Sequence, residues 1–167
     1  LPKPSPWLRR DSKLTKRVVH RFPDANAVAE SVAAKILEKL ESLLKTKNEV
    51  HLVLTGGSVG IQTLASMNSN QKLNDVDFTK VHLWWGDERF VPFEDDRNNA
   101  KMAFDTLLNH VPVPAAQIHV MRTDIEPEAS AAAYANILAN YFTTSDPDST
   151  SFDLVLLGMG DDGHTLS

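Results

Sequence analysis

The chain has 167 residues, of which 42% are hydrophobic and 23% charged, and these ordinary values exclude a collagen-like, low-complexity or wholly disordered protein. It contains no cysteine, which excludes disulfides, thiolate zinc sites and cysteine nucleophiles. The formal net charge of −5 and the lack of any apolar run near the roughly 20 residues of a membrane helix predict no nucleic-acid partner and no membrane partner, and we expect a cytoplasmic location.

The N-terminal segment differs from the rest of the chain because residues 1–21 carry seven Lys and Arg side chains and one Asp. Residues 1–15 contain Pro2, Pro4 and Pro6 and are expected to form an extended arm. A transit peptide is the less favoured interpretation, since the segment is not rich in serine. Residues 16–167 are expected to form a single domain that begins with a short strand at 16–22.

Apolar periodicity predicts four helices. Asp24 is a good N-cap, and it precedes apolar residues that recur every four positions: Val28, Val32, Ile36, Leu40 and Leu44. The other three helices are expected at Ile61–Met67, Asn99–Asn109 and Glu126–Phe142. Between them lie strongly apolar runs expected to be strands: His51–Thr55, Val81–Trp85, Ile118–Met121 and Phe152–Leu157.

This alternation of strands and helices predicts an α/β fold, a Rossmann-like parallel sheet with helices on both faces. Three of the strands are each followed by a polar, glycine-containing cluster. Because ligands of open α/β sheets bind at the carboxyl ends of the strands, the three clusters are expected to meet in one crevice.

The first cluster is Thr55–Gly60, which reads TGGSVG. Glycines let the backbone approach a ligand closely and the N–H groups at a helix N-terminus bind anions, so Gly56, Gly57 and Ser58 are candidate phosphate-binding residues. An ordinary turn in which Ser58 caps the helix is an equally open interpretation. The spacing fits neither the dinucleotide fingerprint nor the P-loop.

The second cluster is Gly86–Pro92 (GDERFVP), followed by Asp95–Asn99 (DDRNN). Arg89 offers a planar fork of donors for phosphate or carboxylate. Asp87 follows a buried strand directly and is suited to orienting a histidine or binding a sugar hydroxyl. The alternative is a solvated Asp–Arg pair with Asn99 capping the next helix, and this alternative is favoured for Arg97.

The third cluster is Gly158–Thr165 (GMGDDGHT). His164 is able to take a proton near neutral pH, and Asp162 is close enough in sequence to fix its tautomer. Asp161, Asp162 and His164 are possible metal ligands, but no second spaced histidine supports such a site and no metal is expected. The remaining histidines are expected to be structural or solvated, and Trp84 and Trp85 to divide between the core and a cleft wall.

Together these clusters resemble the 6-phosphogluconolactonase family, from about Lys16 to the end of the chain. The resemblance implies the α/β fold shared with glucosamine-6-phosphate deaminase, and hydrolysis of 6-phospho-D-glucono-1,5-lactone without a cofactor. The resemblance implies that His164 is the general base and that Asp162 and Asp87 are the other catalytic residues. Gly56, Gly57 and Ser58 would hold the phosphate with Arg89. The expected partner is the phosphorylated sugar lactone, bound by a monomer or a homodimer.

The chain departs from the family at two points. Val59-Gly60 stand where the family usually has Thr-Pro, and Leu166-Ser167 where it usually has Ala-Ser. Family members look longer at the C-terminus, so residues 16–167 are expected to be a catalytic domain whose C-terminal part is missing.

Two other functions remain open. A glucosamine-6-phosphate deaminase would share the fold and both glycine loops, but its second motif typically reads Asp-Glu-Tyr where Arg89 stands here. A non-catalytic phosphosugar-binding module of a transcriptional regulator would share the fold and need no base. Such a module usually accompanies a helix-turn-helix, for which the N-terminal arm is too short and proline-rich.

Overall fold

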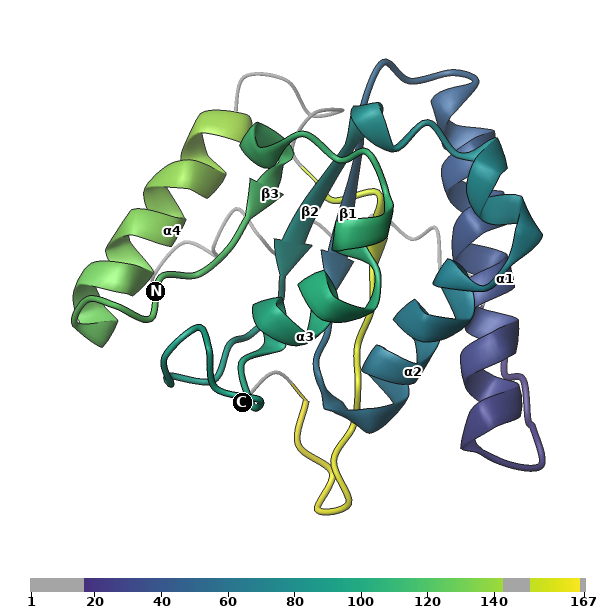
Figure 1. Ribbon diagram of the computed structural model, residues 1–167, viewed down its shortest axis with the longest axis horizontal. Coiled ribbons are helices and arrows are strands. Elements are labelled where there is room, and N and C mark those ends of the chain that lie inside the picture. The colour runs from purple at the N-terminus through teal and green to yellow at the C-terminus, as the bar shows by residue number, and fades with distance from the viewer. Residues whose placement is uncertain (1–16, 143–150, 166–167) are drawn as a thin grey trace, which may run out of the picture.

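Four parallel strands form the sheet in residues 17–142 and 151–165, the part of the chain that the computed structural model describes (Figure 1). At its centre β1 (Val50–Leu54) pairs with β2 (Val81–Trp85). The outer strands are β3 (Ile118–His119), beside β2, and β4 (Leu154–Val155), beside β1. The predicted parallel α/β sheet is thereby confirmed.

Side chains of the two central strands alternate between the faces of the sheet, as the period of two requires. Leu52 and Leu83 are paired in register and join the main apolar core. Their neighbours His51, His82 and Trp84 contact one another on the opposite face. Trp84 and Trp85 therefore point to opposite sides. Both are buried, so neither forms the expected cleft wall.

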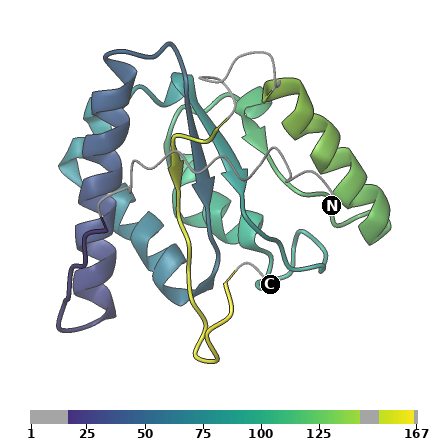
Figure 2. The ribbon, with the colours of Figure 1, turned by 180° about the vertical axis from the view of Figure 1, so that it is seen from behind.

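Three helices cover the core face: α1 (Ala25–Leu44), α2 (Gly57–Asn68) and α3 (Asn99–Thr106). The carboxylate of Asp24 accepts the N–H of Ala27 at 2.8 Å, which confirms the predicted N-cap of α1. α1 buries Ile36, Leu37 and Leu40 against the sheet and against α2. Figures 1 and 2 show α1 and α2 on one side of the sheet and α4 (Pro127–Tyr141) on the other.

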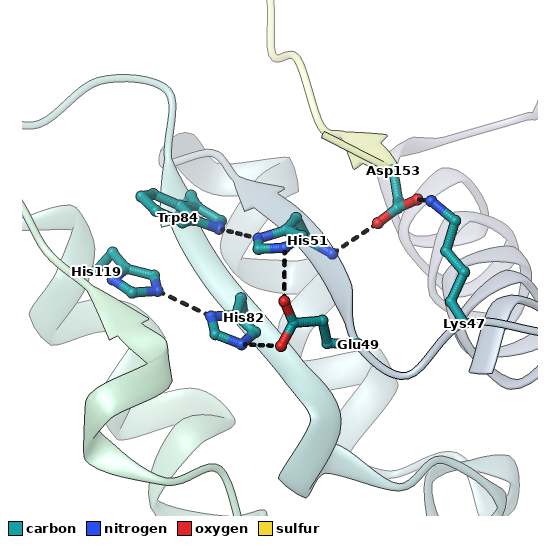
Figure 3. Close-up of polar contacts among 7 residues, drawn as sticks. All are labelled: Lys47, Glu49, His51, His82, Trp84, His119 and Asp153. Atoms are coloured by element: carbon teal, nitrogen blue, oxygen red, sulfur yellow. Dashed lines mark hydrogen bonds and ion pairs between the residues drawn. The ribbon is translucent and has the colours of Figure 1, made fainter. Parts of the chain in front are cut away.

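The face under α4 is aromatic and polar, and Figure 3 shows its hydrogen bonds. Nδ1 of His82 lies 3.1 Å from Nε2 of His119, and the indole N–H of Trp84 donates to Nδ1 of His51 at 3.1 Å. The Glu49 carboxylate lies 3.3 Å from Nε2 of His82 and 3.8 Å from Nε2 of His51. Burial lowers the pKa of all three imidazoles, that of His119 to about 4. We call His51, His82 and His119 the histidine trio.

Short 3₁₀ helices complete the connections, and they lie at Gln71–Asp75, Phe78–Lys80, Leu108–His110 and Ala115–Gln117. The predicted helix Asn99–Asn109 is thus α3 followed by a 3₁₀ turn, because Leu107 leaves helical geometry at φ −135°. Among the described helices, none combines the length and the apolar character needed to cross a membrane.

Three strand predictions need correction. The strand expected at Ile118–Met121 is reduced to β3, which ends at His119. Residues 17–22 form no strand, and Val18 and Val19 are 60% and 57% exposed. The segment contacts α1 through His20 and Lys35, and it is not part of the four-stranded sheet. The predicted strand Phe152–Leu157 is reduced to β4. Val155 and Leu157, which belong to the predicted strand, are exposed at the edge of the described sheet. The expected arm at 1–15 lies outside the described residues.

Candidate functional site

The first cluster forms the turn from β1 into α2, and its two glycines are required for different reasons. Gly57 has φ +78°, which only glycine adopts without strain, and a Cβ there would meet no atom within 4 Å. Gly56 has an ordinary φ of −80°, but a Cβ there would overlap the side-chain amide of Asn99. Packing against Asn99 therefore demands glycine at 56, independently of any ligand.

The N-terminus of α2 is the part of this turn suited to an anion. Gly56 is its N-cap, and within the described residues no side chain bonds the N–H groups there. The alternative interpretation in which Ser58 caps the helix is wrong, since Ser58 lies inside the first turn and is exposed. The N–H groups at the start of the helix and the Ser58 side chain face open space, which suits an anionic group.

The second cluster leaves β2 and is fixed to the N-terminus of α3. Glu88 accepts the N–H groups of Asn99 at 2.6 Å and Ala100 at 2.9 Å, as well as the N–H of Arg89 at 2.7 Å. Burial raises the pKa of Glu88, and these backbone N–H groups oppose the rise. Asp87 is half-buried and Arg89 is exposed. A lone Glu between two polar residues is no sequence signal for binding the N-terminus of a helix, so this role of Glu88 is visible in the structure alone.

The cap of α3 also differs from the predicted one. Asn98 is the N-cap and accepts the N–H of Lys101 at 2.8 Å, whereas Asn99 is the first residue of the helix. The amide of Asn99 instead donates to the carbonyl of Asp87 at 3.2 Å. The solvated pair expected for Arg97 is confirmed, since its guanidinium binds the Asp95 carboxylate at 2.7 Å and is largely exposed.

The third cluster forms a tight loop closed by its own backbone. The N–H of Gly160 donates to the carbonyl of His164 and the N–H of Gly163 to the carbonyl of Gly160, both at 2.9 Å. Nδ1 of His164 contacts the Asp162 carboxylate, and this hydrogen bond lowers the pKa of Asp162. Gly163 has φ +87°, and a Cβ on Gly160 would overlap the His164 ring. Both side chains of the pair are solvent-exposed.

The backbones of the three clusters meet at the carboxyl ends of β1, β2 and β4. The N–H of Gly86 donates to the carbonyl of Leu54, and Gly158 faces the Thr55 hydroxyl, where a Cβ would lie 3.5 Å from Oγ1. Asn99 touches Gly56 and binds Asp87. Within the described residues the His164–Asp162 pair lies on a loop that extends past the end of the sheet (Figures 1 and 2). The backbones of the three segments are therefore neighbours, but within the described residues the His164 imidazole does not contact Asp87 or Arg89, and a single crevice shared by the three clusters stays a prediction.

A cavity of about 410 Å³ lies beside the second cluster, and no sequence signal indicated it. Its wall includes Glu88 and Phe90, Met121 after β3, and Tyr134 of α4. The Tyr134 hydroxyl accepts the N–H of Trp85 and donates to its carbonyl, both at 3.1 Å, and burial raises the Tyr134 pKa. In residues 17–142 and 151–165, no three His, Asp or Glu side chains are grouped to hold a metal ion.

The family model described as glucosamine-6-phosphate isomerases/6-phosphogluconolactonase matches residues 23–167. The chain is 36% identical to a 6-phosphogluconolactonase of Mycobacterium tuberculosis over 151 residues, which cover 87% of this chain and 60% of the relative. The chain is 38% identical to a 6-phosphogluconolactonase of Streptomyces coelicolor over 159 residues, which cover 90% of this chain and 59% of the relative. The solved 6-phosphogluconolactonase of Thermotoga maritima matches with a TM-score of 0.76 at 26% identity, over 90% of this chain and 63% of that one. The chain thus spans about three fifths of each relative's length.

Proposed function

Because the chain belongs to the family of glucosamine-6-phosphate isomerases and 6-phosphogluconolactonases, we propose that the protein containing it hydrolyses 6-phosphogluconolactone. The observation that carries this proposal is the His164–Asp162 pair, held in a glycine loop that begins beside the turn after β1. The 6-phosphogluconolactonases that are 36% and 38% identical to this chain support the same substrate.

The phosphate of the substrate binds at the N-terminus of α2. Backbone N–H groups of Gly57 and Ser58 offer donors and the partial positive charge of the helix end. Arg89, exposed at the end of the neighbouring strand, adds a guanidinium fork to the phosphate. Holding this distant group fixes the lactone carbonyl relative to the attacking water.

His164 acts as the general base. Asp162 accepts a hydrogen bond from Nδ1–H, which leaves Nε2 unprotonated and free to take a proton from water. The hydroxide oxygen adds to the lactone carbonyl carbon, and N–H groups of the loops or Arg89 stabilise the resulting oxyanion. The carbon–oxygen bond of the ring then breaks, and the proton held by His164 passes to the ring oxygen that leaves. Asp87 binds a sugar hydroxyl, and neither a cofactor nor a metal takes part.

The deaminase and the binding module are the competing functions. Arg89 favours the lactonase, since a guanidinium suits a phosphate or an oxyanion better than the tyrosine typical of the deaminase motif. The His164–Asp162 pair favours an enzyme, since a binding module needs no base. The expected location is cytoplasmic.

The test is a direct assay with three readouts. Purified gene product is incubated with 6-phosphogluconolactone, and acid release is followed after subtraction of spontaneous hydrolysis. Ammonia release from glucosamine 6-phosphate is measured in parallel, and binding of 6-phosphogluconate by calorimetry. Catalysed acid release supports the proposal, ammonia release selects the deaminase, and binding without turnover of either substrate selects the binding module.

A further inference from the structure

The loop between β2 and α3 contains two candidate site residues but no helix or strand over residues 86–98. Asp87 and Arg89 therefore depend on other contacts for a fixed position. Two side chains supply these contacts. Glu88 binds three backbone N–H groups, two of them at the start of α3, and Asn99 binds the carbonyl of Asp87.

Asn99 also connects this loop to the turn after β1. Its side-chain amide is buried, at 3% exposure of the residue, and fills the space where a Cβ of Gly56 would stand. One amide thus contacts the Gly56-Gly57 turn and binds the backbone carbonyl of Asp87. Because the Asn99 side chain contacts both turns, a change at Asn99 should shift them relative to each other.

We propose that Glu88 and Asn99 are positioning residues, which fix the Gly56-Gly57 turn and the Asp87–Arg89 loop in the mutual geometry that a phosphosugar requires. This inference rests on the proposed function for its substrate and on the contacts above for its geometry. Neither side chain has to touch the substrate. Misplacement of about 1 Å at such a distance from the chemistry costs up to about 100-fold in rate.

The neighbouring residue Asn98 provides a matched control. Asn98 and Asn99 are both buried asparagines at the start of α3, and Asp at either place adds the same charge at the same helix end. Asn98→Asp keeps the acceptor for the N–H of Lys101. Asn99→Asp keeps the shape but loses the donor to the carbonyl of Asp87. The pair of variants thereby separates the loss of the Asn99 contact with Asp87 from a change in the N-cap of α3.

We expect Asn99→Asp in the complete gene product to lower kcat/KM for 6-phosphogluconolactone by about tenfold or more, with a raised KM, while Asn98→Asp stays within about twofold of the unmodified protein. Thermal melting of both variants is measured beside the kinetics. Equal kcat/KM in the two variants would overturn the positioning role. Asn99→Ala and Asn98→Ala are the second pair, used if the Asp variants melt below the assay temperature.

A readout that needs no activity keeps this inference separate from the proposed function. Gly56→Ala should destabilise the protein through its overlap with Asn99, and Asn99→Ala should relieve that overlap in the double variant. In amide NMR spectra, Asn99→Ala should shift the signals of Gly57 and Arg89, and Asn98→Ala should not. If no lactone is hydrolysed, the proposed function fails. The positioning role of Asn99 is tested separately: it is overturned if the stability changes of Gly56→Ala and Asn99→Ala are additive and the amide signals of Gly57 and Arg89 do not shift.

Discussion

At the scale of single residues, Gly57 is the position where a special backbone conformation and the proposed phosphate site coincide. Its φ of +78° is open only to glycine without strain, and the space beyond it is empty of protein atoms within 4 Å. Gly57→Val should raise KM several-fold by filling that space, and the positive φ should cost about 1–3 kcal/mol of stability. KM and the free energy of unfolding measure the two effects.

Gly57→Asn is the control for strain, because Asn tolerates positive φ better than Val. A raised KM in both variants assigns the effect to the added side chain in the proposed phosphate site. An unchanged KM in a folded Gly57→Val variant would exclude the phosphate role of this turn.

His164 is the residue on which the proposed chemistry depends. His164→Ala should lower kcat by about 100-fold or more with little change in melting temperature, because the ring is exposed and, among the described residues, forms its hydrogen bond with Asp162. Initial rates of acid release, corrected for spontaneous hydrolysis, measure the loss. Asp162→Asn should lower kcat as well, whereas Asp161→Asn, an exposed neighbour, should leave it unchanged. Near-normal turnover without His164 would remove it from the mechanism.

At the scale of elements, Tyr134 of α4 completes the end of β2. β3 ends opposite Trp84, so the backbone groups of Trp85 beyond it bond the Tyr134 hydroxyl instead of a strand. Tyr134→Phe should lower the free energy of unfolding by about 1–3 kcal/mol, because a buried donor and acceptor lose their partner. Chemical denaturation measures this change. Tyr141→Phe on the same helix is the control and should cost less, since among the described residues Tyr141 packs against aromatic rings.

The sequence predicted elements best where local pattern and burial agree. The bounds of β2 are as predicted, because five buried residues are followed directly by Gly86. The strand prediction for residues 16–22 was wrong, because a strand needs a neighbouring strand to pair with and two valines in sequence do not show whether one is present. Asn98 and Asn99 show the same limit at the candidate site. Either is a good N-cap by composition, and only the position of Glu88 and Gly56 in space decides which one caps the helix.

At the scale of the whole molecule, the histidine trio makes stability depend on pH. Burial lowers the pKa of each imidazole, so below the unfolded value of about 6.5 the unfolded chain binds more protons than the folded one. The free energy of unfolding should therefore be highest above pH 6.5 and fall as the pH drops toward 4, where His119 titrates in the folded state. Each proton bound only by the unfolded chain contributes about 1.4 kcal/mol per pH unit.

The charged groups around the trio set the size of this effect. Glu49 faces His51 and His82 and raises their pKa, which opposes burial, whereas Lys47 lowers the pKa of His51. Urea denaturation between pH 7.5 and 4.5 measures the slope. His119→Gln should make it shallower, and His110→Gln, an exposed site, should leave it unchanged. Parallel curves for all three proteins would show that the pKa of His119 is the same in the folded and the unfolded chain.

The stacking of Trp84 on His119 gives the protein an optical signal of its own. The two ring centres lie 3.8 Å apart at an interplanar angle of 20°. A protonated imidazole accepts an electron from an excited indole, so the fluorescence of Trp84 should dim when His119 takes up its proton. Trp85, on the other face of the sheet, packs in the apolar core and lacks this neighbour. Emission lifetimes therefore follow, without any label, the protonation of the two histidines that contact Trp84, which are His119 and His51.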